Sequence, residues 1–234
     1  SELERQSVAY DFTLLFRIFR TYADFLINTN NAKLAKKILD KYYPLLKNNP
    51  RSNFTSFGGK DLLVIDYQLA LSNILLHLDW RNATEQEYLD AIEKLEDLIP
   101  AVTRLENSMG NIPPSRKYVQ RVDIYTTLSK FYRASIIDKD EVAEDYLLKS
   151  YELSKKYQSS AGMFYTLYQL VILNDIDKDD PIATKKYALE ALKLADQHPQ
   201  FKKFHIYADI LDTISGNLFH DEHKFNEAYT YSKE

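Results

Sequence analysis

The chain has 234 residues, of which 45% are hydrophobic and 27% are charged, a balance typical of a folded protein rather than a disordered or fibrous one. Its formal net charge of -4 argues against a dominant nucleic-acid-binding role, because phosphate recognition needs clustered lysine and arginine, whereas here both signs are interspersed. There is no cysteine, which excludes disulfide bonds, thiolate zinc sites and cysteine nucleophiles. No apolar run reaches the roughly 18 residues that a membrane-spanning helix requires.

Amphipathic helical patterns, separated by short polar breaks, cover nearly the whole chain. In the first half they predict helices at about Ser7–Asn28, Ala32–Lys47 and Asp61–Leu78, and a fourth helix that follows Thr84. Thr84 and Glu87 form a capping-box pattern, in which each side chain accepts a hydrogen bond from an otherwise unpaired backbone amide. Because proline lacks an amide hydrogen and clashes with the carbonyl four residues earlier, Pro100 predicts a kink or break near Ile99.

A long break at 109–115, which contains glycine and two prolines, is predicted to be a hinge. Beyond it the helical patterns become shorter and more regular. They predict helices at about Ser115–Ile137, Asp140–Tyr157, Ala161–Asn174 and Pro181–Gln197, followed by a pair that begins near Phe201 and breaks at His220–Lys224. Asp180 before Pro181 is a strong helix-start signal, because the aspartate can accept amide hydrogens of the first turn and proline suits the first helical position.

One spacing pattern recurs along the chain: an aromatic residue is followed by apolar or small residues three, four and seven positions later. Its clearest form is Tyr125, Leu128, Ser129 and Tyr132, and similar patterns start at Phe19, Tyr67, Tyr165 and Tyr207, so that successive leads are 48, 58, 40 and 42 residues apart. Intervening helices carry a matching stripe of mostly small side chains, at Ala143, Leu147, Ser150 and Ser154 and again at Thr184, Ala188, Ala191 and Ala195. Since small side chains let a neighbouring helix approach closely, we expect stacked helix pairs with the leading aromatics packed between them.

These residues resemble the tetratricopeptide repeat, whose signature is W-x2-L-G-x2-Y in one helix and A-x3-F-x2-A in the next. Tyr125 and Ser129 replace the family's tryptophan and glycine. The first repeat matches both parts of the signature, at Phe19, Tyr22, Ala23, Leu26, Ala35, Leu39 and Tyr42. The chain departs from the family where Leu71, Gln169 and Leu211 occupy the small-residue position, and its units exceed the usual length of about 34 residues.

The resemblance covers about residues 8–234 and implies an all-α fold, namely a right-handed α-α superhelix of about five antiparallel helix pairs in a single domain over 1–234. An irregular helical bundle is the alternative architecture. The chain begins at Ser1 and stops at Glu234 within a predicted helix, so we expect it to be a fragment or a processed form of a longer protein.

In this family the first helices of the pairs line a concave groove, so the resemblance implies that polar residues beside the leading aromatics bind a peptide. Carried over position by position, the groove residues are Arg17, Arg20, Asp24, Gln68, Ser72, Asp123, Thr126, Lys130, Arg133, Thr166, Asn174, His205 and Asp212, with Met163 beside them. Such a mixture suits an extended peptide, whose backbone needs hydrogen-bond donors and acceptors. The alternative for any one of them is a merely solvated side chain.

No catalytic, cofactor-binding or metal-binding residue is predicted. His220, Asp221, Glu222 and His223 form a metal-like cluster, since imidazoles and carboxylates bind divalent ions. They lie at a turn between helices, however, where polar residues are expected anyway.

We therefore expect a non-catalytic helical-repeat module that binds a protein or peptide segment, as the sensory or scaffolding part of a larger, bacterial and cytoplasmic regulator. The repeat pattern also resembles the receptor domains of peptide-pheromone-responsive transcription regulators, whose DNA-binding part lies elsewhere, so this segment is not expected to bind nucleic acid directly. Three alternatives stay open: an oligomeric scaffold built from copies of the chain, an extracytoplasmic sensor domain, and a metal-dependent enzyme that uses the turn at His220–His223.

Overall fold

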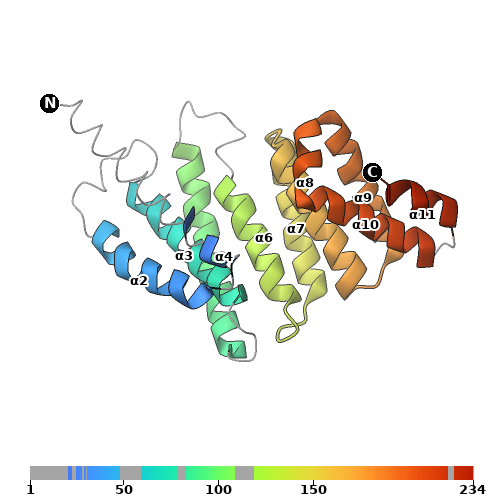
Figure 1. Ribbon diagram of the computed structural model, residues 1–234. Helices are drawn as coiled ribbons and strands as arrows, with labels where there is room; N and C mark the ends of the chain where they lie inside the picture. Colours follow the sequence, from blue (N-terminus) through green and yellow to red (C-terminus); the bar gives the residue numbers. More distant parts are fainter. Residues whose placement is uncertain are drawn as a thin grey trace. The chain divides into compact units, whose positions relative to one another are not determined.

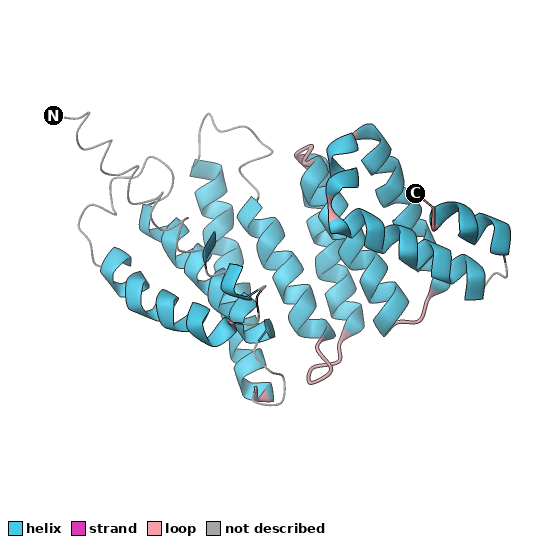
Figure 2. Ribbon diagram, viewed as in Figure 1, coloured by secondary structure: helices cyan, strands magenta, loops and turns pink. Residues whose placement is uncertain are grey.

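The computed structural model describes residues 21–22, 25–27, 29, 31–47, 59–77, 83–108, 119–220 and 224–233, and all regular structure among them is helical (Figure 1, Figure 2). The all-α prediction is confirmed for this part of the chain. The α-helices are α2 (Ala32–Lys47), α3 (Gly59–His77), α4 (Glu85–Ser108), α6 (Val119–Arg133), α7 (Asp140–Lys156), α8 (Ser160–Ile172), α9 (Pro181–Gln197), α10 (His205–His220) and α11 (Phe225–Tyr231). Leu173–Asp177 forms a π-helix, η2, and Pro199–Lys203 forms a 3-10 helix, η3. Within the described ranges, none of the helices is both long enough and apolar enough to cross a membrane.

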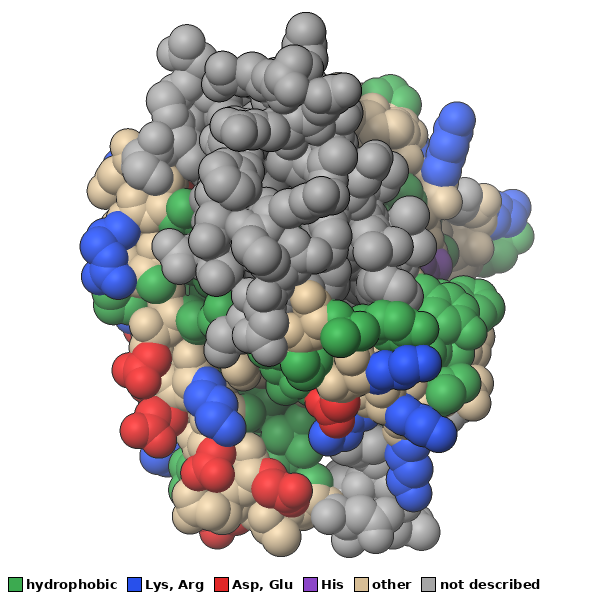
Figure 3. All heavy atoms as spheres, turned by 90° about the vertical axis from the view of Figure 1, so that its left-hand side faces the viewer, with side chains coloured by type: hydrophobic (Ala, Val, Ile, Leu, Met, Phe, Trp, Pro, Cys, Tyr) green, Lys and Arg blue, Asp and Glu red, His purple; other side chains and the backbone are tan. Residues whose placement is uncertain are grey.

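The described residues separate into two compact units, one that ends at Phe131 and one that begins at Tyr132. The first contains α2, α3, α4 and nearly all of α6, and the second contains the helices from α7 onward. The side of the molecule shown in Figure 3 carries basic and acidic side chains close together among its described residues, in keeping with the interspersed charges of the sequence. The predicted hinge at 109–115 and most of the predicted first helix lie outside the described residues.

Within the first unit, α3 packs against both α2 and α4. The contact between α2 and α3 includes the rings of Tyr43 and Tyr67, which stack with their centroids 3.6 Å apart. The Tyr67 hydroxyl also donates a hydrogen bond of 3.0 Å to the Asp40 carboxylate. Burial, followed by this hydrogen bond, raises the pKa of Tyr67 to about 12. The tyrosine therefore stays neutral and links the two helices at physiological pH.

Two helices begin with the caps that the sequence predicts. Before α4, the Thr84 amide donates to the Glu87 carboxylate at 2.8 Å and the Glu87 amide donates to the Thr84 hydroxyl at 3.3 Å, which completes the capping box. These hydrogen bonds from Thr84 lower the pKa of Glu87. Before α9, the Asp180 carboxylate accepts hydrogen bonds from the amides of Ile182 at 3.1 Å and Ala183 at 3.0 Å. Both caps satisfy amides that have no partner within the helix.

Of the predicted kink or break near Ile99, the break is wrong, because α4 continues through Pro100 to Ser108. An interior proline costs a helix about 3 kcal/mol, since it removes one hydrogen bond and crowds the preceding turn. Leu95 and Val102, one turn before and shortly after the proline, are both buried. Their burial offsets the cost and holds the helix together on either side of Pro100.

Helix α8 is central to the second unit, since it packs against α7, α9 and α10. The stripe of mostly small side chains on α7 and α9 is buried throughout, with at most 1% of each residue exposed: Ala143, Leu147, Ser150, Ser154, Thr184, Ala188, Ala191 and Ala195. The close approach is clearest at Gly162 of α8, where a Cβ atom would lie 2.5 Å from the Ser154 hydroxyl oxygen. These small residues therefore allow α7 and α8 to come closer than larger side chains would permit.

Three helix ends in the second unit differ from the sequence prediction. Helix α6 ends at Arg133 rather than at Ile137. Helix α8 ends at Ile172 and is followed directly by η2, which extends to Asp177 rather than ending at Asn174. Helix α10 begins at His205 rather than near Phe201, because Pro199–Lys203 forms the separate turn η3. This turn shapes the candidate site described below.

Candidate functional site

Two helices of the second unit, α8 and α10, share a surface. Tyr165 and Tyr168 are three residues apart on α8, and His205 and Asp209 are four apart on α10, so each pair lies on one side of its helix. The Tyr168 hydroxyl donates a hydrogen bond of 2.9 Å to the Asp209 carboxylate, which joins the two rows. We call the surface made by Ala161, Tyr165 and Tyr168 of α8 and by His205, Asp209 and Asp212 of α10 the α8–α10 face.

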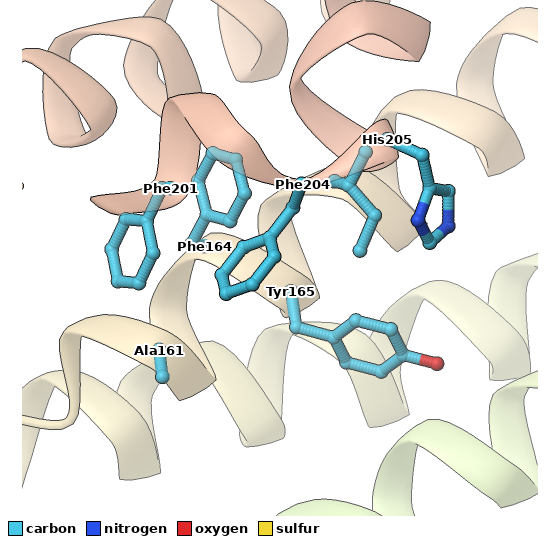
Figure 4. A pocket seen from close by; sticks show the side chains of 7 residues that line it. Ala161, Phe164, Tyr165, Phe201, Phe204 and His205 are labelled. Atoms are coloured by element: carbon cyan, nitrogen blue, oxygen red, sulfur yellow. The ribbon is translucent and has the colours of Figure 1, made fainter. Parts of the chain in front are cut away.

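A pocket of about 260 Å³ lies at the N-terminal end of the α8–α10 face (Figure 4). Its lining comes from α8 and from the junction of η3 with α10, and consists of Ala161, Phe164, Tyr165, Phe201, Phe204, His205 and Ile206. Phe164 and Phe201 are both buried and their rings stack with centroids 4.8 Å apart, so they form a fixed base. Phe204, whose ring centroid lies 6.1 Å from that of Phe201, is 51% exposed and forms part of the rim.

Backbone hydrogen bonds hold the junction of η3 and α10 in place. The amide of Phe201 donates to the His198 carbonyl at 2.9 Å, that of Phe204 to the Phe201 carbonyl at 3.0 Å, and that of Tyr207 to the Phe204 carbonyl at 3.0 Å. Each of these bonds spans three residues, as in a 3-10 turn. The aromatic residues of the junction are therefore positioned by the backbone as well as by contacts between their rings.

The two segments that line the pocket carry basic residues and no acidic ones. The segments Ser159–Thr166 and Pro199–Ile206 contain no aspartate or glutamate, while the second contains two lysines and a histidine. Lys202 forms an ion pair of 2.7 Å with Asp196, whereas Lys203 is exposed and forms no ion pair within the described part of the chain. The first turns of α8 and α10 carry no acidic side chain, so the partial positive charge of each helix N-terminus is not offset by its own residues.

Further along α10, Asp209 and Asp212 make the α8–α10 face acidic, and Asp212 is exposed. Burial, followed by the hydrogen bond to Asp209, raises the pKa of Tyr168 to about 12, while the nearby Arg133 guanidinium acts in the opposite direction. Tyr168 is therefore neutral at physiological pH and serves as a hydrogen-bond donor. Thus the face combines an apolar pocket with charged groups of both signs.

Arg133, at the end of α6, is held by an ion pair with η2. Its guanidinium lies 2.6 Å from the Asp177 carboxylate, and 15% of its side chain is exposed. Lys178, the residue that follows η2, places its ammonium group 2.5 Å from the carboxylate of Glu144 on α7. Arg133 would therefore have to leave Asp177 before it could bind a carboxylate of a ligand.

The predicted groove residues fall into three groups. Arg17, Arg20 and Asp24 lie outside the described residues. Those that are buried are Ser72, Thr126, Thr166 and Asn174. Those that are partly or fully exposed are Gln68, Asp123, Lys130, Arg133, His205 and Asp212. Among these exposed residues, His205 and Asp212 lie on the α8–α10 face, whereas Gln68, Asp123 and Lys130 belong to the first unit.

Three of the four buried members of the predicted groove form hydrogen bonds inside the protein. The Thr166 hydroxyl donates to the Gly162 carbonyl at 2.8 Å and lies 3.0 Å from the hydroxyl of Ser150. The hydroxyl of Thr126 and the amide nitrogen of Asn174 each donate to a carbonyl one turn earlier in the chain, at 3.0 Å and 2.8 Å. A ligand would have to displace these bonds to reach the residues.

Sequence reasoning did not identify most of the α8–α10 face. Tyr165 was expected to pack between helix pairs, yet it lines the pocket, while its counterpart Tyr207 is buried as expected. The signal that could have revealed the face is the spacing of four and three residues shared by Ala161, Tyr165 and Tyr168 and by His205, Asp209 and Asp212. Phe201 and Phe204 were not recognised as part of a site.

Among the described residues, no group of three histidine or carboxylate side chains is placed to hold a metal ion. Of the metal-like cluster, Asp221, Glu222 and His223 lie outside the described residues.

No protein-family model matches the chain, and no curated protein or solved structure shows significant similarity to it. The function is therefore inferred from the α8–α10 face itself.

Proposed function

We propose that this chain is a non-catalytic helical-repeat module that binds a peptide or a segment of a protein on its α8–α10 face. The observation that carries the proposal is the combination, on one surface, of the aromatic pocket with the exposed side chains of His205 and Asp212. An extended peptide needs both kinds of contact, because its side chains fill pockets while its backbone pairs with polar groups.

We further propose that the module is a tetratricopeptide-like, right-handed superhelix, and contacts that recur between its helices support the stacking of similar helix pairs. Tyr168 of α8 bonds to Asp209 of α10, and Tyr151 of α7 likewise donates to Glu190 of α9. The partners are 41 and 39 residues apart, close to the repeat length in this half of the sequence. Corresponding helices of successive pairs are thus joined by the same kind of bond, as stacking of similar units requires.

The chemistry of the pocket favours binding over catalysis. Its lining includes one histidine and no carboxylate. A histidine that acts as a general base or activates a nucleophile needs partner groups within hydrogen-bond reach. We propose that the module binds rather than catalyses, and that it acts as the sensory or scaffolding part of a larger regulator, in which other parts respond to binding.

Selection of binding peptides tests the proposal. The chain is exposed to a phage-displayed library of random peptides, and selected peptides are synthesised and titrated by calorimetry, with an expected Kd of about 1–100 µM. Changing both His205→Glu and Asp212→Lys should weaken binding by about tenfold or more, since both residues are exposed on the α8–α10 face. Lys193→Glu, at an exposed position of α9 outside the face, is the matched control and should bind like the wild type. A failure to select any peptide, or full affinity in the double variant, would contradict the proposal.

A further inference from the structure

The pocket has the size of one large side chain. Its volume of about 260 Å³ exceeds the roughly 150 Å³ of an apolar cavity that holds benzene. It falls below the roughly 300–1,000 Å³ of pockets that enclose drug-sized ligands. An aromatic or long aliphatic side chain therefore fits better than a whole cofactor.

The pocket has a buried, rigid base and a partly exposed rim, so a side chain can enter it from solvent. Phe164 and Phe201 stack against each other and are buried, so the base keeps its shape without a ligand. Phe204, by contrast, leaves about half of its surface in water. An apolar side chain that enters the pocket would cover part of this exposed ring, and removing apolar surface from water is favourable.

The charges around the pocket favour an anion next to the apolar group. Lys203, which precedes Phe204 in the chain, is exposed, and His205 contributes to the lining. The first turns of α8 and α10 add the partial positive charge of two helix N-termini, with no acidic side chain of their own to offset it. The pocket is therefore complementary to an apolar side chain with a neighbouring carboxylate.

We propose that the pocket receives one large apolar side chain of a peptide, and that a carboxylate next to this side chain lies near Lys203. This inference rests on the proposed function and names the chemistry that the partner must contain. The carboxylate is that of an aspartate, a glutamate or the C-terminus of the peptide.

N-acetyl-L-phenylalanine carries both groups and is the first probe. When it is titrated into the 15N-labelled wild-type chain, the amide signals of Ala161, Phe204 and His205 should shift. N-acetyl-L-phenylalaninamide lacks the carboxylate and should bind about two- to fivefold more weakly, the factor expected for one exposed ion pair. Lys203→Glu should abolish that difference, and the control Lys193→Glu should preserve it. Equal binding of the two probes to the wild type would overturn the acidic part of the inference.

Filling the pocket tests the apolar part. Ala161→Trp introduces a large side chain from an exposed position of α8, and Leu189→Trp introduces the same side chain on α9 outside the lining. Thermal unfolding checks that both variants are folded. Ala161→Trp should lower the affinity for the phage-selected peptides by about tenfold or more, as expected for loss of a central apolar anchor. Leu189→Trp should leave this affinity unchanged.

The outcomes separate this inference from the proposed function. If peptides are selected and Ala161→Trp binds them as tightly as the wild type, the proposed function stands and the inference is overturned. If the wild type selects no peptide, the proposed function fails, and binding of the probes would then mark a small-molecule site, which also overturns the inference. Peptides that lose affinity on C-terminal amidation support a terminal carboxylate, and those that lose it on replacement of an acidic residue by its amide support a side chain.

Discussion

The Tyr168 hydroxyl and the Asp209 carboxylate lie 2.9 Å apart and join α8 to α10. Tyr165, one turn before Tyr168, and His205, one turn before Asp209, both line the pocket. The hydrogen bond therefore connects the same two helix faces that form the walls of the pocket. Stability and ligand binding should both depend on it.

Replacing Tyr168 by phenylalanine should lower the free energy of unfolding by about 0.5–1.5 kcal/mol, because the ring is kept while one hydrogen bond is lost. Asp209 is exposed, so the change leaves no buried carboxylate without a partner. Urea denaturation measures the effect. Asp209→Asn keeps an acceptor oxygen and should cost less. A Tyr168→Phe protein as stable as the wild type would show that the bond does not hold the helices together.

Gly162→Ala should destabilise the second unit by about 1–3 kcal/mol, as overpacking of a close contact does. The new methyl group would lie 2.5 Å from the Ser154 hydroxyl oxygen, so the Ser154 side chain or one of the two helices must move. Gly216 of α10 is the matched control, since a Cβ atom there would meet nothing within 4 Å. Gly216→Ala should therefore stabilise by about 0.5–1 kcal/mol, as expected inside a helix. Thermal unfolding of both variants should show opposite signs, and a shared sign would refute the account of this packing.

Glu106 gives the first unit a stability that depends on pH. It is 3% exposed and lies 2.7 Å from the Arg121 guanidinium. Burial raises its pKa from 4.5 to about 7, an effect that the charge of Arg121 only partly offsets. Since the folded-state pKa is the higher one, folding takes up protons between these two values. The stabilising contribution is fully present below about pH 4.5 and is lost as the pH rises through about 7.

Glu106→Gln should remove this dependence, which amounts to at most about 3 kcal/mol. Urea denaturation at pH 5 and at pH 8 measures it, and the difference between wild type and variant isolates Glu106 from other titrating groups. The wild type should lose more stability than the variant over this interval. Equal losses would show that Glu106 is not the group responsible.

Pro100→Ala should stabilise α4 by about 1–3 kcal/mol, because it restores an amide hydrogen in a helix that already continues past this position. Pro100 is exposed, so no core packing is lost. Differential scanning calorimetry compares the midpoints. A lower midpoint in the variant would mean that the proline is needed for the path of the helix.

Helix periodicity and capping are local properties, and for this reason the sequence predicted them well. Helices α2 and α9 have the predicted bounds, and Asp180 caps α9 as expected. The prediction of a helix break at Pro100 failed, because tertiary packing acts there against a local rule. The burial of Leu95 and Val102 outweighs the cost of the proline, and burial is not visible in the spacing of one helix.

The candidate site could be predicted only in part, because it depends on contacts between distant segments. Its base forms where Phe201 of η3 stacks on Phe164 of α8, and no spacing pattern within one helix indicates this pair. Thr166 and Asn174 hold positions that line the groove in the resembled family, yet both are buried and bond to carbonyls of α8. Distinguishing them from the exposed His205 requires knowing which sides of α8, η2 and α10 face neighbouring helices.

Binding of a peptide on the α8–α10 face is tested most directly by titrating a selected peptide into the 15N-labelled chain and following the backbone amide signals. We predict that the largest shifts occur at Ala161, Tyr165, Phe204, His205 and Asp212. Largest shifts confined to residues of the first unit, such as Gln68 and Lys130, would contradict the assignment of this face.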